Sequence, residues 1–349
     1  MYMLLRQTLR NLKIFLKDRA NVFFSLMAPL IVLALYILFL GRLQSDGLLE
    51  VLQKAGFSGA ETEKAVQAFC DAWMLAGCLA SACITVPLCA CGVIVQDRKR
   101  GITSDLLASP VPAWMPPAAY FLSVFAAGLC LSLIVLAVSF LWLAASGSWF
   151  LSAADVFGCI GNVFLSVLSS SALLSVVIRF VRTEGAFTGV NIIFGTVIGF
   201  LIGAYMPISL FPDGVQKFTL FIPGSYSAGL FRNLIMGGAL DEISRVTSGL
   251  VVSALKREYS FSFDFFGLEI GMGGMAAVLA ISAVIFLSVC LLLNILEIRA
   301  GGRKEKKGGR SFTLNAAFKH FTKGGKSGII EKSENCPPDA GRKGGKDGL

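Results

Sequence analysis

The residues that could do chemistry are few, and their spacing argues against most reactions. Among nine cysteines, Cys83, Cys89 and Cys91 stand close enough together to bind a soft metal such as copper. No acidic residue or histidine stands among them, and the only histidine of the chain, His320, is far away in the sequence. We therefore expect no metal site and no disulfide framework, and we interpret the cysteines within apolar runs as small packing residues.

A glycine-lysine motif near the C-terminus resembles the end of a phosphate-binding loop. It has the sequence GGKS at 324–327. A complete loop needs a glycine five residues before Gly325, where His320 stands, and a strand that leads into it. We therefore expect no nucleotide site and no catalytic residues in this chain, which excludes a nucleotide-hydrolysing enzyme.

Composition places the chain in a membrane. Hydrophobic residues make up 55% of the 349 positions, charged residues make up only 15%, and the mean hydropathy is +0.73. The net charge of +9 does not indicate nucleic-acid binding, because the basic residues flank apolar runs or lie in the C-terminal segment. The sequence predicts an all-α protein with several membrane-spanning helices.

Six apolar runs are long enough to cross a bilayer, which needs roughly 20 residues. They cover approximately 21–41, 73–95, 118–143, 156–178, 187–206 and 271–295. Of the 31 lysines and arginines, 23 fall in the N-terminal segment, the second and fourth connections and the C-terminal segment. This distribution predicts that both termini are cytoplasmic in the plasma (inner) membrane.

The first twenty residues have the pattern of an amphipathic helix on the cytoplasmic leaflet. At 100° per residue, Leu5, Leu9, Leu12 and Leu16 share one stripe. Basic residues at 6, 10, 13 and 17 share another. This pattern favours an interfacial helix over the alternative of a simple positively charged flank.

The predicted spans contain no Asp, Glu, Lys, Arg or His away from their ends, so they lack the groups with which a carrier normally couples transport to an ion. Their polar residues are uncharged, and we expect them to form hydrogen bonds between helices more often than ligand sites. These residues are Asn162, Asn191, Asn294, Ser166, Ser169, Ser170, Ser171 and Ser175. In the fifth span, Gly195, Gly199 and Gly203 form a packing face for a helix of the same chain or of a second protomer.

The region 207–270 neither spans a membrane nor has a soluble composition. Pro207, Pro212 and Pro223 separate two apolar pieces, 215–222 and 226–236, which are too short to cross. They predict a re-entrant hairpin at the outer face that closes over a pathway, with two interfacial helices as the alternative. Within 241–269 we expect an external amphipathic helix and then an interfacial aromatic stretch at 261–266.

The other external and terminal segments are simpler. The loop 42–72 is expected to form an external cap with a short helix near 61–69. The second external loop, 144–154, is too short for a domain. The basic, glycine-rich segment 299–349 is predicted to be a largely disordered cytoplasmic tail.

A polar elbow at 96–117 separates the second and third spans. Its sequence is QDRKRGITSDLLASPVPAWMPP, with three consecutive basic residues, Arg98 to Arg100, and four prolines. The positive charge beside an apolar run predicts a cytoplasmic position. The prolines would make the elbow stiff enough to transmit a push between two spans.

Two stretches in this order resemble the ABC-2 type permease family, the membrane subunits of ATP-driven exporters. DRKRGITSDLLASPVPAW is similar to the basic-Gly-Thr-acidic-Leu-Leu-x-Ser-Pro-Val motif of that family. GAYMPISLFPDGVQKFTLFIPGSYSAGLFRNLIMGG is similar to its proline-rich sequence after the fifth span, and it includes Tyr226 and Arg232. The resemblance covers roughly 1–298.

The resemblance implies a dimeric permease with the pathway between subunits, driven by a separate cytoplasmic ATPase that binds ATP and Mg²⁺. In this family the elbow contacts the ATPase, with Leu106 and Leu107 inserted into a groove. The implied contact residues are Asp97, Arg98, Arg100, Gly101, Thr103, Asp105, Leu106, Leu107, Ser109 and Pro110. The alternative for Arg98 to Arg100 is that they only anchor the elbow to lipid.

The elbow and the start of the third span depart from the family pattern. Lys99 stands where an acidic residue is usual, and Ser104, with Asp105 beside it, stands at a second acidic position. Ala118 and Ala119 replace a Gly-Lys pair. These departures imply either different elbow contacts or a heterodimer in which this chain is the weaker half.

Two other functions stay open. A non-transporting scaffold would use the same elbow to recruit a cytoplasmic partner. A secondary carrier is the third hypothesis, although its ion-coupling groups are missing from the predicted spans. The cargo is not specified by the sequence, although a pathway lined by Phe, Ser and Asn would suit an amphiphile.

Overall fold

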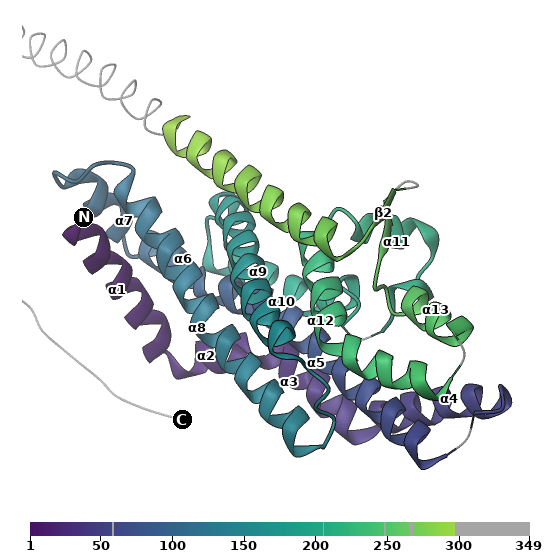
Figure 1. Cartoon of the computed structure of the whole chain (residues 1–349). Helices are drawn as coiled ribbons and strands as arrows, with labels where there is room; N and C mark the ends of the chain where they lie inside the picture. The colour runs from purple at the N-terminus through teal and green to yellow at the C-terminus, as the bar shows by residue number, and fades with distance from the viewer. Residues whose placement is uncertain (58, 205, 248, 266–267, 297–349) are drawn as a thin grey trace, which may run out of the picture. The chain divides into compact units, whose positions relative to one another are not determined.

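The computed structural model describes residues 1–296 except 58, 205, 248 and 266–267, and it is mostly helical (Figure 1). The predicted tail at 299–349 lies outside the described residues, as do His320 and the motif at 324–327. Met1–Leu296 form one compact unit.

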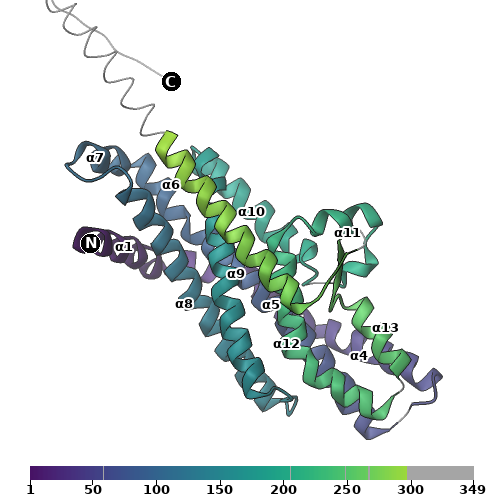
Figure 2. The same cartoon turned by 45° about the horizontal axis from the view of Figure 1, so that its top comes forward.

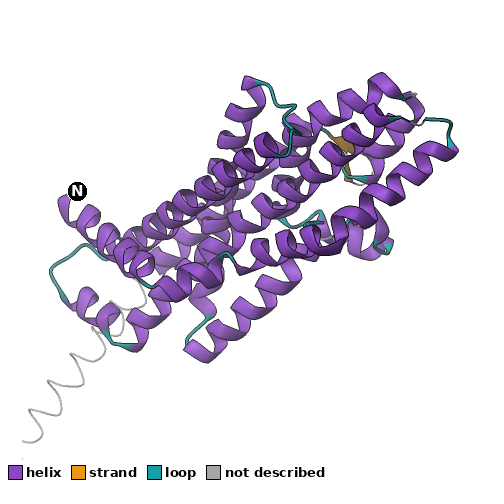
Figure 3. Cartoon of the chain, turned by 90° about the horizontal axis from the view of Figure 1, so that it is seen from below, coloured by secondary structure: helices purple, strands orange, loops and turns teal. Residues whose placement is uncertain are grey.

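The helices of this unit are connected mostly by short turns. They are α1 (Tyr2–Lys17), α2 (Arg19–Ser25), α3 (Met27–Leu35), the π-helix η1 (Tyr36–Leu40), α4 (Gly41–Lys54), α5 (Ala60–Ala90), α6 (Gly92–Lys99), α7 (Ile102–Ala108), α8 (Met115–Ala145), α9 (Ala153–Phe180), α10 (Glu184–Leu201), the 3₁₀ helix η2 (Ile208–Leu210), α11 (Asp213–Thr219), α12 (Pro223–Val246), α13 (Gly249–Glu258) and a last helix, Met272–Leu296. Strands β1 (Phe263–Phe265) and β2 (Leu268–Ile270) form a small antiparallel hairpin beside the helices (Figure 3).

Six helical segments in the described part of the chain are long and apolar enough to cross a membrane. They are Pro29–Lys54, Ala60–Lys99, Met115–Ala145, Ala153–Phe180, Glu184–Leu201 and Met272–Leu296. The predicted number of six spans and the all-α class agree with this result. The chain is a multi-pass membrane protein.

Helix α5 lies at the centre of the bundle, in contact with α3, α8, α9 and α12. From Ala72 onward its residues are apolar or small on every side, and its most apolar stretch is completely buried. A helix that is apolar all round lies either in a protein core or against lipid, and in α5 other helices cover it. By contrast, α10 and Met272–Leu296 lie at the periphery and are mostly exposed.

The two ends of this unit carry different elements. Helices α1 and α7 lie at one end, which we call the elbow end (Figures 1 and 2). Helices α4 and α13 and the strand pair lie toward the other end, which we call the hairpin end (Figures 1 and 2). The elbow and the 207–270 region are therefore at opposite ends, as the alternation of predicted spans requires.

The helix boundaries differ from the predicted ones where the tertiary structure extends or shortens a helix. The helix expected to end at Gly41 continues as α4 to Lys54, because its side chain Leu52 is fully buried in the core around α5. The segment 61–69, expected as a separate helix, forms the first turns of α5. Helix α10 ends at Leu201 instead of Met206, because Gly203 adopts a positive φ of 73°, which reverses the chain.

The region after α10 also has longer elements than the sequence predicted. The second apolar piece, 226–236, belongs to the 24-residue helix α12, which continues to Val246 and packs on α5 and α9. The amphipathic helix expected within 241–269 is therefore divided between α12 and α13. The aromatic stretch at 261–266 is not an exposed band, because Phe261 and Phe263 are buried; Phe266 lies outside the described residues.

Candidate functional site

The elbow begins at a buried carboxylate. Asp97, near the end of α6, is only 2% exposed, and its carboxylate accepts two hydrogen bonds from the guanidinium of Arg10, at 2.5 Å and 3.1 Å. The hydroxyl of Tyr120 donates a third, at 2.7 Å. The hydrogen bond to Asp97 raises the pKa of Arg10 above its usual value. One aspartate thus links α1, α6 and α8.

Helix α1 docks through a face other than the leucine stripe. Asn11 and Phe15 are buried, and α1 lies along α8 (Figure 2). Leu5, Leu9 and Leu16 of the stripe are exposed. The helix therefore attaches to the bundle through Arg10, Asn11 and Phe15 and keeps an apolar surface turned outward.

Arg98 and Lys99 also hold the elbow to the bundle. Arg98 donates to the carbonyls of Ile178 and Val181 at 3.0 Å and 3.1 Å, which belong to the C-terminal turn of α9. Carbonyls at the end of a helix lack some of their intrahelical partners, and the Ile178 carbonyl also accepts from the Val181 amide at 3.2 Å. Lys99, at a position where the family usually has an acidic residue, forms an ion pair with Glu184, the first residue of α10. Lipid anchoring is therefore not the only role of these basic residues.

Helix α7 lies beyond the hydrogen bonds and the ion pair that attach Asp97, Arg98 and Lys99 to the bundle. Gly101 has a positive φ of 76° and begins the helix, which a non-glycine residue would do under strain. Ser104 and Asp105 are exposed, and Leu106 is half-buried. The Ser109 hydroxyl donates to the Leu106 carbonyl at 2.7 Å and closes the last turn.

The ten expected contact residues therefore fall into two sets. Asp97 and Arg98 turn inward and have partners within the chain. Arg100, Asp105 and Pro110 are exposed, while Gly101, Thr103, Leu106 and Ser109 are half-buried. The side chain of Leu107 lies outside the described part of the structure.

The sequence did not reveal the partners of the inward set. Arg10 was grouped with the other basic residues of the N-terminal helix, and Tyr120 and Glu184 were not singled out. A signal was present at Asp97, because a carboxylate directly after an apolar run needs a partner if the helix remains buried. The identity of that partner depends on the fold, since 87 residues separate Arg10 from Asp97.

The three glycines of the fifth predicted span do not form one close-packed face within the described residues. Gly195 has open space where a Cβ would stand, whereas Gly199 is buried. Gly203 lies beyond α10 in a left-handed turn, and its carbonyl accepts a hydrogen bond from Arg232 at 2.8 Å. The role of Gly203 is thus conformational.

Arg232 on α12 is 1% exposed, and it also donates to the Ile202 carbonyl at 3.0 Å. Both of its acceptors lie at the end of α10, so the guanidinium satisfies carbonyls that α10 leaves unpaired. Tyr226 donates to the Leu220 carbonyl at 2.8 Å, which links the start of α12 to the residue after α11. These two residues of the predicted hairpin therefore position backbone turns.

Several polar residues of the spans form the expected bonds between helices. Asn162 and Ser166 on α9 bind Ser227 on α12, at 3.1 Å to its carbonyl and 2.6 Å to its hydroxyl. Ser169 pairs with Ser282 of the last helix at 2.7 Å. Ser175 bonds only within its own helix. The interhelical interpretation is confirmed for Asn162, Ser166 and Ser169.

A second buried aspartate lies toward the hairpin end. Asp71 on α5 is 3% exposed and accepts hydrogen bonds from Tyr36 at 2.9 Å, Gln67 at 3.1 Å and Ser148 at 3.1 Å. The sequence pattern does not single out Asp71, because it stands two positions before the predicted second span. It links η1, α5 and the turn between α8 and α9.

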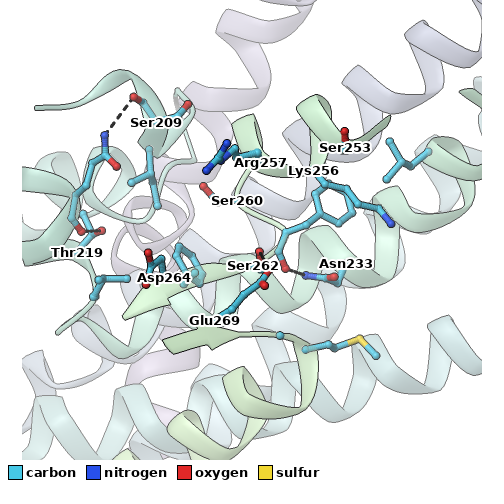
Figure 4. A pocket seen from close by; sticks show the side chains of 18 of the residues that line it. Ser209, Thr219, Asn233, Ser253, Lys256, Arg257, Ser260, Ser262, Asp264 and Glu269 are labelled. Carbon is cyan, nitrogen blue, oxygen red and sulfur yellow. Dashed lines mark hydrogen bonds between the residues drawn. The ribbon is translucent and has the colours of Figure 1, made fainter. Parts of the chain in front are cut away.

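A polar cavity of about 1100 Å³ opens between α11, α12, α13 and the strand pair (Figure 4). Lys256 and Arg257 line it together with Asp264 and Glu269. All four side chains are exposed, so water screens them. Among the described residues, no group of three or more His, Cys, Asp or Glu side chains that could hold a metal ion occurs.

The family relationship follows from comparison with known proteins. A family model described as "ABC-2 family transporter protein" matches residues 59–296, which includes the elbow, α12 and the last helix. No match was found among curated proteins or among solved structures. The matched segment covers more than half of the 349 residues, and the chain belongs to the ABC-2 family of transporter proteins.

Proposed function

We propose that this chain is the permease subunit of an ATP-driven exporter and that a separate cytoplasmic ATPase drives it through the elbow. The observation that carries the proposal is the construction of the elbow. Helix α7 projects from the bundle, while the residues just before it are bonded to α1, α8, α9 and α10. A force on α7 would therefore reach four helices at once.

The two sets of elbow residues have different roles in this proposal. The exposed and half-buried residues of α7 and its following turn contact the ATPase, with Leu106 as an apolar anchor and Asp105 as a charged neighbour. Asp97 and Arg98 are positioning residues, which keep α7 aligned with the spans. ATP and Mg²⁺ bind to the partner subunit.

The topology and oligomeric state belong to the same proposal. Both termini face the cytoplasm of the plasma membrane, as the distribution of basic residues predicts. Two copies, or this chain and a homologous permease, enclose the pathway, and the open space beside Gly195 leaves room for a second copy on α10. The region 207–270 forms a re-entrant outer hairpin. The contact between Gly224 at the start of α12 and Ile84 in the middle of the second span supports this placement.

Co-purification with an ATPase encoded beside this chain tests the proposal. The variant Leu106→Asp places a charge in the proposed contact, and we expect at least a tenfold loss of ATPase binding and of ATP-dependent export. Leu250→Asp is the matched control, because Leu250 is 82% exposed on α13 toward the hairpin end. Both variants should retain the wild-type melting temperature.

The outcome also separates a transporter from a scaffold. A scaffold would bind a cytoplasmic partner, but neither the wild-type protein nor the Leu106→Asp variant would show ATP-dependent export. Unchanged ATPase binding and export in Leu106→Asp would rule out the proposed contact.

A further inference from the structure

A second cavity, partly open at the surface, lies among the apolar helices; some of the residues that line it, such as Ile193 and Phe221, are exposed. Its volume is about 420 Å³, and its walls come from α5, α9, α10, the α11–α12 turn and the last helix. Ile84, Ser170 and Phe286 lie near the middle of three candidate spans, which places the cavity at membrane depth. Pockets of a few hundred Å³ hold drug-sized ligands.

The lining is almost completely apolar. Leu173, Val197, Phe221 and Phe286 are typical of it, and no charged side chain takes part. A charged ligand would lose its hydration in such a site without gaining an opposite charge. The chemistry of the walls therefore selects an uncharged molecule with a large apolar body.

One side chain in the cavity lacks a hydrogen-bond partner. Ser170 is 9% exposed, lines the cavity, and forms no hydrogen bond with any residue in the described part of the chain. Its neighbour Ser169 differs, because its hydroxyl is bonded to Ser282. The hydroxyl oxygen of Ser170 is not enclosed, in contrast to that of the next residue, Ser171, so a molecule in the cavity can reach it.

The start of α12 forms another part of the wall. Ile222, Pro223 and Gly224 line the cavity, and no side chain caps the first turn of this 24-residue helix. The N-terminus of a helix carries a partial positive charge, and here the Gly224 amide is the available donor, because Pro223 has no amide hydrogen and the Ser225 amide donates to the Ile222 carbonyl at 3.0 Å. Together with Ser170, it favours a ligand that carries an oxygen acceptor.

We propose that this cavity binds a neutral amphiphile whose apolar body carries one hydrogen-bond-accepting oxygen, and that the molecule enters from the bilayer. Ser170 donates to the oxygen, and the apolar walls enclose the body. As a statement about cargo, the inference rests on the transport function proposed above. As a statement about binding, it concerns this chain alone.

Photolabelling of the full chain in phosphatidylcholine nanodiscs tests the inference without an ATPase. The probe is dodecanol with a mid-chain diazirine, and labelled residues are identified by mass spectrometry. We expect labelling at Leu173, Val197 and Phe286, which unlabelled dodecanol suppresses at least tenfold more effectively than dodecane. The preference for the alcohol over the alkane isolates the role of the oxygen.

Three variants locate the site. Ser170→Ala should reduce the preference for dodecanol over dodecane about fivefold, which is the loss expected for one hydrogen bond. Ser170→Phe and Val197→Trp fill the cavity from two different helices, α9 and α10, and should each abolish the labelling. Ser175→Ala is the control, because Ser175 is a buried serine of α9 that does not line the cavity.

Two results would overturn the inference. Labelling that persists in both filled variants and is insensitive to dodecanol would show only contact with the bilayer-facing surface. Labelling confined to a monomeric fraction would show that a second copy occupies the cavity in the dimer. If binding is found but ATP-dependent export is not, the binding site stands and the transport function fails.

Discussion

Asp97 and Asp71 lie toward opposite ends of the same helical segment, Ala60–Lys99, and each accepts three hydrogen bonds. All of them come from other elements except the bond from Gln67, which stands four residues before Asp71 in α5. Their donors differ. Asp97 is paired with the cation of Arg10, whereas Asp71 is bound by the neutral groups of Tyr36, Gln67 and Ser148.

The difference between charged and neutral donors reflects how strongly apolar packing already fixes the chain around each carboxylate. Around Asp71 the chain is already fixed by apolar packing, since the neighbouring Phe69 and Trp73 are buried in the main core. Helix α1 buries only Asn11 and Phe15, so its attachment depends more strongly on Arg10. An ionic contact is thus used where few side chains of the helix are fully buried, at the end that we propose receives the ATPase.

The largest effect is expected from breaking the ionic pair. Arg10→Ala leaves a buried carboxylate without its cation and should lower the free energy of unfolding by about 3 kcal/mol. That value is the lower end for buried pairs, because the Arg10 side chain is 37% exposed and partly solvated. Denaturant titration in mixed micelles measures it, and Lys13→Ala, an exposed neighbour, should change little.

Removing the other carboxylate should cost less. Asp71→Ala leaves three neutral donors without their acceptor, and we expect a loss of about 2 kcal/mol in the same titration. Asp71→Asn keeps an acceptor oxygen and should cost about half as much. If Asp71→Ala proved more destabilising than Arg10→Ala, the proposed difference between the two ends would be reversed.

Single hydroxyl deletions compare the two networks one bond at a time. Tyr120→Phe and Tyr36→Phe each remove one donor to an aspartate. Each should lower the free energy of unfolding by about 1 kcal/mol, and the larger loss should occur at Tyr120, where the acceptor is an ion-paired carboxylate. Equal losses would mean that the ion pair does not strengthen its neighbouring hydrogen bond.

The smallest expected effect is that of salt. Raising the ionic strength from 0.1 M to 1 M shortens the screening length to about 3 Å, so the contribution of Arg10 should fall by a few tenths of a kcal/mol. The loss in the free energy of unfolding caused by Asp71→Asn should be the same at both salt concentrations. A double-mutant cycle of Arg10 and Asp97 at both salt concentrations provides the measurement.

The sequence predicted the parts of this fold that depend on local pattern. Apolar run length predicted six spans, and the charged, proline-rich 96–117 region predicted the elbow. Tertiary packing determined the rest. Leu52 extends α4 by burying itself against the α5 core, and Gly203 ends α10 early by reversing the chain.

The sequence predicted where in the chain the elbow lies, but it did not predict which residues its side chains contact. The motif located α7, yet the functions of Asp97 and Arg98 depend on partners 80 or more residues away. Ser170 also could not be singled out from the sequence. It is a serine next to another serine, Ser169, in the same helix, so the local sequence does not distinguish the two. Only the arrangement of helices gives the Ser169 hydroxyl a partner and leaves the Ser170 hydroxyl without one among the described residues.

Site-specific photo-crosslinking from α7 tests the central claim most directly. A photoreactive amino acid is placed at Leu106, or at Leu250 as the control, and the permease is illuminated with its ATPase in proteoliposomes with and without ATP. We predict a crosslink to the ATPase from position 106, a change in its yield with ATP, and none from position 250. A bound ATPase that crosslinks from neither position, or equally from both, would contradict the account.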